Sequence, residues 1–303
     1  MHATDLLKFF DARAARKEQL VLVTVLATHG STYSKAGDFI LIDAAGVVCG
    51  MLSGGCLESD LAVRARVVLE SGKAQTATYE LAAGDEDIWG LGVGCDGSMT
   101  VYLQPLIAAH NYQPFTAMAS ALRGQTPAKV RIEKGDGTLL LELAVRPPPH
   151  ILILGAGRDA VPLAQLVDGL GWRCSVFDHR PAYIENPEFP AACAKHCAQA
   201  DALPSVVDLS LIDSAIVMSH HLSSDRAYLR ALADTAIDYV GLLGPPARKQ
   251  RLLSELGDQG AALAGRLHGP AGLRLGGRGP ELIALAIVAH MQQVLHAGSS
   301  ASA

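Results

Sequence analysis

One segment near the middle of the chain, residues 150–180, constrains the fold more than any other. It reads HILILGAGRDAVPLAQLVDGLGWRCSVFDHR. A short apolar run ends at Gly155-Ala156-Gly157, a helical pattern follows, and a second apolar run stops at Asp178. This order is typical of a dinucleotide-binding βαβ unit, in which Gly155 permits the tight turn and Gly157 lets the backbone approach a pyrophosphate. Asp178 lies where a carboxylate can accept a hydrogen bond from a ribose hydroxyl, so the segment predicts the fold but leaves the chemistry open.

The rest of the second half alternates strands and helices. The expected strands cover residues 151–154, 173–177, 214–218 and 239–243, and the expected helices are centred near residues 165, 229, 251 and 288. Such alternation predicts a doubly wound parallel sheet.

The first half has no repeating strand–helix order. Expected helices cover 4–17, 53–71 and 114–123, and expected strands cover 20–28, 39–42, 47–51, 75–81, 98–104, 128–133 and 138–145. The stretch Arg146-Pro147-Pro148-Pro149 is typical of a stiff linker. We therefore predict an α/β chain with an N-terminal mixed α+β domain (1–145) followed by a Rossmann-like doubly wound parallel-sheet domain (149–298).

Composition excludes several classes of protein. The 303 residues are 50% apolar and 18% charged, with a formal net charge of -5. A nucleic-acid-binding protein would need a basic face, and no run of about eighteen apolar residues is present to span a membrane. The N-terminal segment is charged and lacks the apolar core of a secretory signal, so we expect a cytoplasmic protein. The six cysteines include no CxxC pair, which argues against structural zinc, and Cys193 and Cys197 could share a helical face.

The first candidate site is Ser53-Gly54-Gly55-Cys56, which lies between a strand and a helix. Two consecutive glycines expose backbone N–H groups and favour an anion-binding nest. A cysteine at a helix start favours the thiolate, which is a nucleophile, a sulfur acceptor or a soft-metal ligand. Glu58 suits the positive end of the helix. The alternative interpretation is a tight turn with a small, buried cysteine, the usual environment of a free thiol.

The second candidate is the glycine-rich stretch 90–97, which contains Cys95. Four glycines are costly to order, so a strained turn or a nearby ligand must compensate. If this loop folds against the loop of Cys56, two thiols face one pocket.

The third candidate is His220, at the end of a strand in the second half. Open α/β sheets hold ligands at the carboxyl ends of their strands. A histidine there could contact phosphate, donate a proton or bind a metal. The alternative is that the neighbouring serines cap the next helix while His221 lies in solvent.

Taken together and in order, these segments resemble the XdhC/CoxI family of molybdenum hydroxylase maturation proteins over nearly the whole chain. The string of residues 53–58, SGGCLE, and the downstream glycine–cysteine loop are the specific part. The full set is Gly30-Ser31-Thr32-Tyr33, Gly37, Ser53-Gly54-Gly55-Cys56-Leu57-Glu58, Gly94-Cys95, Gly97, Gly155-Ala156-Gly157, Asp178-His179-Arg180-Pro181, Ser219-His220, Gly241-Leu242-Leu243-Gly244 and Gly272-Leu273-Arg274-Leu275-Gly276.

The resemblance implies a molybdenum cofactor chaperone, an accessory protein rather than a turnover catalyst. Such proteins bind molybdopterin or its cytosine dinucleotide, protect it, assist its sulfuration and insert it into a hydroxylase such as xanthine dehydrogenase. The implied partners are a cysteine desulfurase, the large subunit of the apo-hydroxylase and a second copy of the chain in a homodimer. Cys56 is the implied metal contact, with Cys95 second. Ser53, Gly54, Gly55 and Glu58 shape its site, and Gly155, Gly157, Asp178 and His220 bind a phosphate portion or a separate nucleotide.

This chain departs from the family pattern at three positions. Ser34 stands where many relatives carry arginine, Asp96 replaces a glycine beside Cys95, and Leu222 occupies the place of a second histidine. Ser34 therefore implies a missing phosphate contact, and Asp96 places an acid next to the proposed site.

Two other functions stay open on the residues. One is an NAD(P)-dependent oxidoreductase with Asp178 on the ribose and His220 as acid or base, which leaves Cys56 and Cys95 without a role. The other is a nucleotide-binding scaffold that only links proteins and binds no small molecule.

Overall fold

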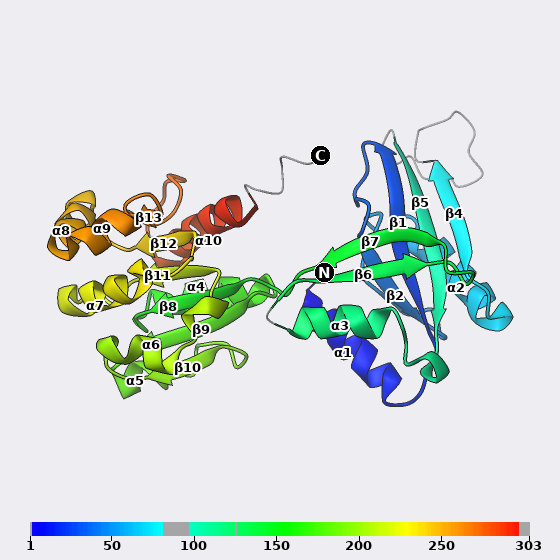
Figure 1. Ribbon diagram of the computed structural model, residues 1–303, viewed down its shortest axis with the longest axis horizontal. Coiled ribbons are helices and arrows are strands. Elements are labelled where there is room, and N and C mark those ends of the chain that lie inside the picture. Colours follow the sequence, from blue (N-terminus) through cyan, green and yellow to red (C-terminus); the bar gives the residue numbers. More distant parts are fainter. Residues whose placement is uncertain (1, 81–96, 125, 297–303) are drawn as a thin grey trace. The chain divides into compact units, whose positions relative to one another are not determined.

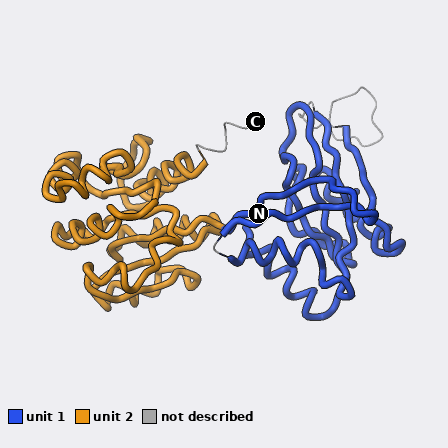
Figure 2. The backbone as a smooth tube through the Cα atoms, viewed as in Figure 1, with its two compact units in different colours: residues 1–147 blue, residues 148–303 orange. Residues whose placement is uncertain are grey.

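The computed structural model describes residues 2–80, 97–124 and 126–296. The chain divides into two compact units, residues 1–147 and 148–303, shown in different colours in Figure 2. Cys95 and Asp96 lie outside the described residues, so the predictions made for them remain predictions.

The first unit is built on a five-stranded antiparallel sheet with the order β3-β2-β1-β5-β4 (Figure 1). Its strands are β1 (Leu20–Gly30), β2 (Phe39–Asp43), β3 (Val48–Cys49), β4 (Gln75–Glu80) and β5 (Gly97–Leu106). A separate antiparallel hairpin follows, formed by β6 (Ala128–Glu133) and β7 (Leu139–Val145). These strands agree with the predicted ones, and no boundary differs by more than two residues.

Both faces of this sheet are covered, and β1 shows why. Successive side chains of a strand point to opposite faces. Val21, Val23 and Val25 belong to a core cluster with α2 (Glu58–Ser71). Leu20 and Leu22 belong to a second cluster with α1 (Ala3–Ala14), α3 (Phe115–Arg123) and the β6–β7 hairpin. A strand apolar on both faces therefore becomes the centre of a three-layer unit.

The second unit is a six-stranded parallel sheet with the order β10-β9-β8-β11-β12-β13. Its strands are β8 (His150–Leu154), β9 (Arg173–Asp178), β10 (Ala194–Cys197), β11 (Ser214–Val217), β12 (Tyr239–Leu242) and β13 (Leu267–His268). The chain builds one side of the sheet outward from β8 and then returns to β11. The strand order therefore reverses between β8 and β11, which is where such sheets bind ligands. The predicted doubly wound parallel sheet is confirmed.

Helices cover both faces of this second sheet (Figure 1). One core cluster joins α4 (Ala160–Gly169) and α10 (Pro280–His296) to one face, and the other joins α7 (Leu222–Ala233) and α8 (Pro246–Leu256) to the opposite face. The remaining helical elements of this unit are α5 (Pro181–Ile184), α6 (Leu203–Val206), α9 (Asp258–Leu263) and the 3-10 turns η2 (Ala200–Ala202) and η3 (Leu209–Leu211). The 3-10 turn η1 (Ala108–His110) belongs to the first unit. The idea that Cys193 and Cys197 share a helical face is wrong, because residues 194–197 form strand β10.

Within the described ranges, no helix combines the length and the apolar character needed to cross a membrane.

Candidate functional site

The loop that joins β3 to α2 is organised by the Glu58 carboxylate. One of its oxygens accepts hydrogen bonds from the Leu52 and Ser53 amides at 2.8 and 3.0 Å, and the other accepts from the Ser53 hydroxyl at 2.6 Å. The Ser53 hydroxyl in turn accepts from the Leu57 amide at 2.7 Å. Ser53 and Glu58 therefore close the loop on itself and leave Cys56 between them.

The charge on Glu58 is stabilised by this arrangement. Partial burial of the side chain opposes ionisation, but the hydrogen bonds from Ser53 and Leu52 outweigh it and hold the pKa of Glu58 below its usual value. Glu58 is therefore a fixed anion at neutral pH.

The helix begins later than the sequence indicates. The sequence predicts that it opens at Ser53, yet α2 starts at Glu58 with Leu57 as its N-cap. The reason lies in Gly54 and Gly55, whose φ values of +74° and +111° are incompatible with a right-handed helix. Cys56 thus precedes the first helical turn instead of lying within it.

The same two glycines leave donors exposed. Both are solvent-exposed, and a Cβ atom on either would meet no atom of the described residues within 4 Å. Among the described residues, the amides of Gly54 and Gly55 donate to no protein acceptor. Cys56 itself is half-buried and carries a free thiol. The loop therefore presents a reachable sulfur beside unpaired main-chain donors, which is the geometry of an anion nest.

Contacts of α2 locate the loop at one end of the sheet. Asp60, in the first helical turn, accepts a hydrogen bond from the Tyr79 hydroxyl at 2.5 Å and pairs with Arg64 at 2.6 Å. Tyr79 lies opposite Met99 in the β4–β5 ladder, two residues from Gly97. The start of α2 therefore lies beside the last residues of β4 and the first of β5, which flank the segment that carries Cys95.

Gly97 packs too closely for any other residue. It lies opposite Gly30, and a Cβ atom on it would come within 2.4 Å of the His29 carbonyl oxygen and 2.7 Å of that of Ser31. The polar loop after β1 thus lies against the start of β5. Ser34, the residue that departs from the family arginine, is 2% exposed, so its short side chain is packed inside the protein.

A crevice in the second unit holds the remaining predicted residues. Gly155, with φ +116°, follows β8, and a Cβ atom there would lie 2.6 Å from the backbone of Ser219, after β11. The two loops at the reversal of strand order therefore touch main chain to main chain. Beside them lies a cavity of about 810 Å³ that Gly157 and His220 help to line. The structure thus brings Gly155, Gly157 and His220 together.

Asp178 is engaged by the protein itself. Its carboxylate is fully buried and accepts from the Ala156 amide at 2.8 Å, the Arg180 amide at 2.9 Å, and the Arg180 guanidinium at 2.9 and 2.7 Å. Burial opposes its charge, yet these bonds hold the pKa of Asp178 below its usual value. The predicted hydrogen bond to a ribose hydroxyl stays a prediction, and it would have to displace one of these donors.

His220 also has a protein partner. Its Nε2 atom lies 2.7 Å from an oxygen of Asp159, and its backbone adopts a φ of +57°, uncommon for a residue other than glycine. The next helix is organised by Ser219, whose hydroxyl donates to buried Asp225 at 2.5 Å and accepts from the His221 amide at 3.2 Å. His221 contacts the Ser223 and Ser224 hydroxyls. Sequence reasoning gave no role to Asp159, and it named Arg180 only as part of the family string 178–181. Each lies two residues after a predicted site residue.

Two family models match the chain in the places where these two sites lie. The model described as the XdhC and CoxI family matches residues 13–80, and the model described as the XdhC Rossmann domain matches residues 151–291. Together they cover more than two thirds of the sequence. The chain belongs to the XdhC and CoxI family.

Relatives of known name support this membership across the whole length. A Bacillus subtilis (strain 168) protein, whose name describes it as a probable subunit of xanthine dehydrogenase, is 28% identical, with 93% of this chain and 95% of that protein covered. The "Molybdenum cofactor insertion chaperone PaoD" of Escherichia coli (strain K12) is 24% identical, with 90% and 83% covered. A crystal structure described as a xanthine dehydrogenase from Bacillus halodurans is 26% identical, covers 100% of this chain and 98% of that chain, and has a TM-score of 0.81.

The donor set of the described residues limits what kind of metal the loop of residues 53–58 could hold. No group of three or more His, Cys, Asp or Glu side chains in ranges 2–80, 97–124 and 126–296 is placed to bind a metal ion. A lone thiol cannot fix a bare ion, which needs several protein ligands. A single thiol with amide donors does fit a metal that arrives already bound to an organic ligand and needs one more contact.

Proposed function

We propose that this protein is a chaperone of the molybdenum cofactor and that the loop of residues 53–58 is where the cofactor is held. In this proposal the cofactor is cargo, not a resident group. The single observation that carries the proposal is the Cys56 thiol, half-buried and reachable, beside the Gly54 and Gly55 amides, which donate to no acceptor in the part of the chain that the structure describes. The name of one relative, a molybdenum cofactor insertion chaperone, points to the same class of cargo.

The chemistry of the loop suits such a cargo. A thiolate is a soft donor and matches a metal held by sulfur ligands. The neighbouring amides suit the oxygen atoms of a phosphate, since N–H groups at a nest donate to anions without carrying charge. Glu58, itself bound by Ser53 and Leu52, keeps both features in place. Cys95 is the second proposed contact.

Protection, sulfuration and insertion are the finer parts of the proposal. The loop would hold the cofactor while a terminal oxo ligand is replaced by sulfide and leaves as water. The sulfide would come from the persulfide of a cysteine desulfurase after two-electron reduction by a thiol. It would then pass the cofactor to the large subunit of an apo-hydroxylase such as xanthine dehydrogenase. Transfer of a labile cargo requires direct docking, for which exposed apolar side chains are suited. Val63 and Val67, 60% and 45% exposed and one turn apart on α2, are candidates. We further propose a cytoplasmic location and a homodimer.

Replacement of the thiol tests the proposal. The Cys56→Ala variant, produced in cells that make the cofactor, is expected to retain several-fold less molybdenum and pterin after purification than the unaltered protein. Cys197→Ala is the matched control, because Cys197 is also a free and accessible thiol but lies on β10 of the second unit. Unchanged molybdenum content in Cys56→Ala, or an equal loss in Cys197→Ala, would exclude the thiol as the principal contact.

A further inference from the structure

The crevice of the second unit has features that the proposed cargo loop does not use. Its cavity of about 810 Å³ lies at the carboxyl ends of β8, β9 and β11, between the loops that carry Gly157, Arg180 and His220. Open α/β sheets bind nucleotides at this place. The side chains in and beside the cavity determine which nucleotides fit.

The carboxylate that usually receives a ribose is not available to one. A carboxylate has about four acceptor positions. In Asp178 the Ala156 amide, the Arg180 amide and two guanidinium N–H groups occupy them, and the side chain has 0% exposure. A ribose with free 2′ and 3′ hydroxyls therefore finds no carboxylate to accept from it.

Arg180 presents the opposite chemistry to the cavity. Its guanidinium uses Nε and Nη2 on Asp178, its Nη1 donates to none of the described residues, and its side chain is 34% exposed. The guanidinium carbon lies 3.8 Å from the centre of the Tyr183 ring, so the aromatic ring fixes its plane. The pairing with Asp178 also holds the pKa of Arg180 above its usual value. A rigid guanidinium of this kind matches a phosphate group, and its open face can stack on a base.

Arg158 adds a second positive charge. It lines the same cavity, it is exposed, and no ion pair with another described residue is recorded for it. Since the charges of Arg180 and Asp178 cancel, Arg158 supplies a further positive charge, which Asp159 in the same lining offsets while its carboxylate stays over Gly157.

We infer that this cavity binds a nucleotide whose ribose carries a phosphate monoester, as NADP⁺ does, in preference to one with a free ribose diol, as in NAD⁺. The monoester lies against Arg180, and the pyrophosphate lies over Gly157 near the start of α4. This inference does not rest on the Cys56 loop, and either can fail without the other.

The pyrophosphate position is now filled by the chain itself. A Cβ atom on Gly157 would lie 2.6 Å from an Asp159 oxygen, so the carboxylate occupies the space that the missing side chain leaves. That space is where a pyrophosphate approaches the second glycine. His220 holds Asp159 there at 2.7 Å. Binding therefore requires Asp159 to swing aside, and its negative charge weakens the affinity for every pyrophosphate ligand.

The test is calorimetric titration of the full chain with NADP⁺ and NAD⁺. The unaltered protein is expected to bind NADP⁺ at least ten-fold more tightly. Arg180→Gln is expected to abolish this preference, because it removes the phosphate donor and frees Asp178 to accept a ribose. Equal affinity for both nucleotides, or no binding of either at millimolar concentration, overturns the inference, as does a folded Arg180→Gln variant that keeps the preference.

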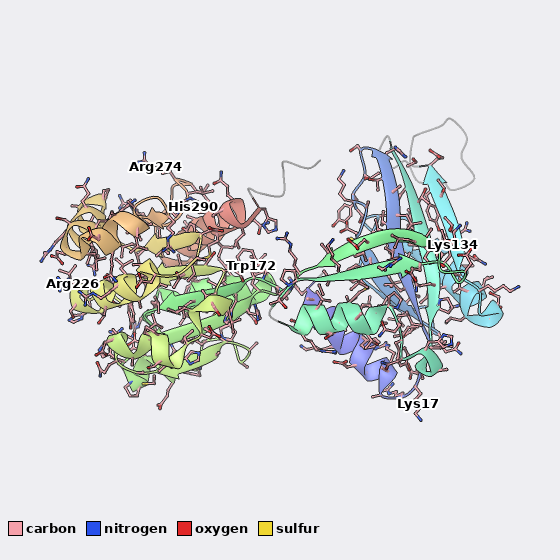
Figure 3. All side chains as sticks on the ribbon, in the orientation of Figure 1. Lys17, Lys134, Trp172, Arg226, Arg274 and His290 are labelled. Atoms are coloured by element: carbon pink, nitrogen blue, oxygen red, sulfur yellow. The ribbon has the colours of Figure 1, made fainter. Side chains whose placement is uncertain are left out.

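Two further variants keep the test decisive if Arg180→Gln does not fold. Tyr183→Ala removes only the ring on which the guanidinium lies. It is expected to weaken the binding of NADP⁺ several-fold, whereas the affinity for NAD⁺ changes little. Asp159→Asn removes the negative charge that competes with the pyrophosphate and is expected to tighten the binding of both nucleotides. Unaltered affinities in both variants would overturn the assignment of these residues. The control is Arg226→Gln, since Arg226 also pairs with an acid, Glu255, but lies on α7 (Figure 3) and does not line the cavity.

The phosphate monoester could also belong to molybdopterin, and competition distinguishes the two sources. NADP⁺ bound to the Cys56→Ala variant is titrated with molybdopterin. Displacement assigns the monoester position to the pterin as well, and retention assigns it to the nucleotide alone. Both results keep Arg180 as the phosphate ligand, and that role is refuted if inorganic phosphate and 2′-AMP bind Arg180→Gln as tightly as the unaltered chain.

Discussion

Replacement of Glu58 is expected to loosen the Cys56 loop without removing the thiol. The carboxylate accepts three hydrogen bonds, two from backbone amides and one from a hydroxyl. A hydrogen bond to a charged group contributes about 1.5–3 kcal/mol, and a buried donor left without a partner costs about 1–3 kcal/mol. Because the site is only half-buried and water can replace part of the loss, Glu58→Ala should lower the free energy of unfolding by roughly 2–4 kcal/mol.

Glu58→Gln should cost less, about 1–2 kcal/mol, because an amide oxygen can still accept from one or both backbone N–H groups. Glu70→Gln is the matched control, since Glu70 lies exposed on the same helix. Urea denaturation measures the free energies, and the rate of alkylation of Cys56 by iodoacetamide measures loop order. Both Glu58 variants are expected to alkylate faster at Cys56 and to retain less molybdenum.

The pH dependence provides an independent check on the same residue. The pKa of Glu58 is depressed in the folded chain, while an unfolded glutamate has a pKa of about 4.3. The unfolded state therefore binds the proton more readily, so the stabilisation is complete above that value and is lost as the pH falls through the folded pKa. Glu58→Gln should lack this step. If Glu58→Ala matches the unaltered protein in stability, alkylation rate and acid response, the carboxylate does not hold the loop.

Two further predictions concern the second unit and the glycines. Gly155→Ala should lower the free energy of unfolding by about 3 kcal/mol or more, because its Cβ would overlap the Ser219 backbone. Gly54→Ala should lower it by about 1 kcal/mol, through backbone strain alone. Equal unfolding midpoints of the two variants in urea would refute this difference. Burial, together with the charge of His290, lowers the pKa of His268 to about 4. Stability should therefore rise from pH 4 to about 6.5, by about 1–2 kcal/mol after allowance for solvent screening, and His268→Phe should flatten that rise in pH-dependent urea curves.

The elements with a regular apolar pattern could be predicted from the sequence. The strand at Leu20–Gly30 is apolar on both faces, and the parallel strands of the second unit are short apolar runs between helical patterns. Both patterns indicate burial directly. A strand that is covered on both faces has few positions for polar side chains, so it is a nearly continuous apolar run. The alternation predicts a doubly wound parallel sheet, whereas the order of its strands is known only from the structure.

Short elements escaped prediction because they carry too little signal. Strand β13 has two residues and β10 has four, three of which are partly or fully exposed polar side chains or thiols. Neither shows an alternation that could separate it from a loop. Their position is set by pairing with a neighbouring strand, which is a tertiary property and not a local one.

The residues of each site could be predicted from the sequence, but the hydrogen bonds and ion pairs among them could not. Spacing placed Asp178 at the end of a strand, yet it gave no sign that Arg180 turns back onto the same carboxylate. Likewise, a glycine pair indicated the loop before α2, but that helix starts only at Glu58 because positive φ values interrupt it. Side-chain pairings over two or more residues depend on backbone turns that a linear pattern does not encode.

The form of the Cys56 loop bears on how a cargo could be released. A chaperone must hold its cargo tightly enough to protect it and loosely enough to give it away, so the lifetime of the complex is set mainly by the dissociation rate. A closed, multi-ligand metal site would make that rate very slow, as structural sites do. One thiol and a few amides on glycines that lie in solvent provide far fewer contacts. Because Glu58 already orders the loop through Ser53 and Leu52, little entropy is lost on binding. Under the proposed function, pre-ordering lets a small set of contacts bind the cofactor, and their small number lets a hydroxylase with more ligands take it.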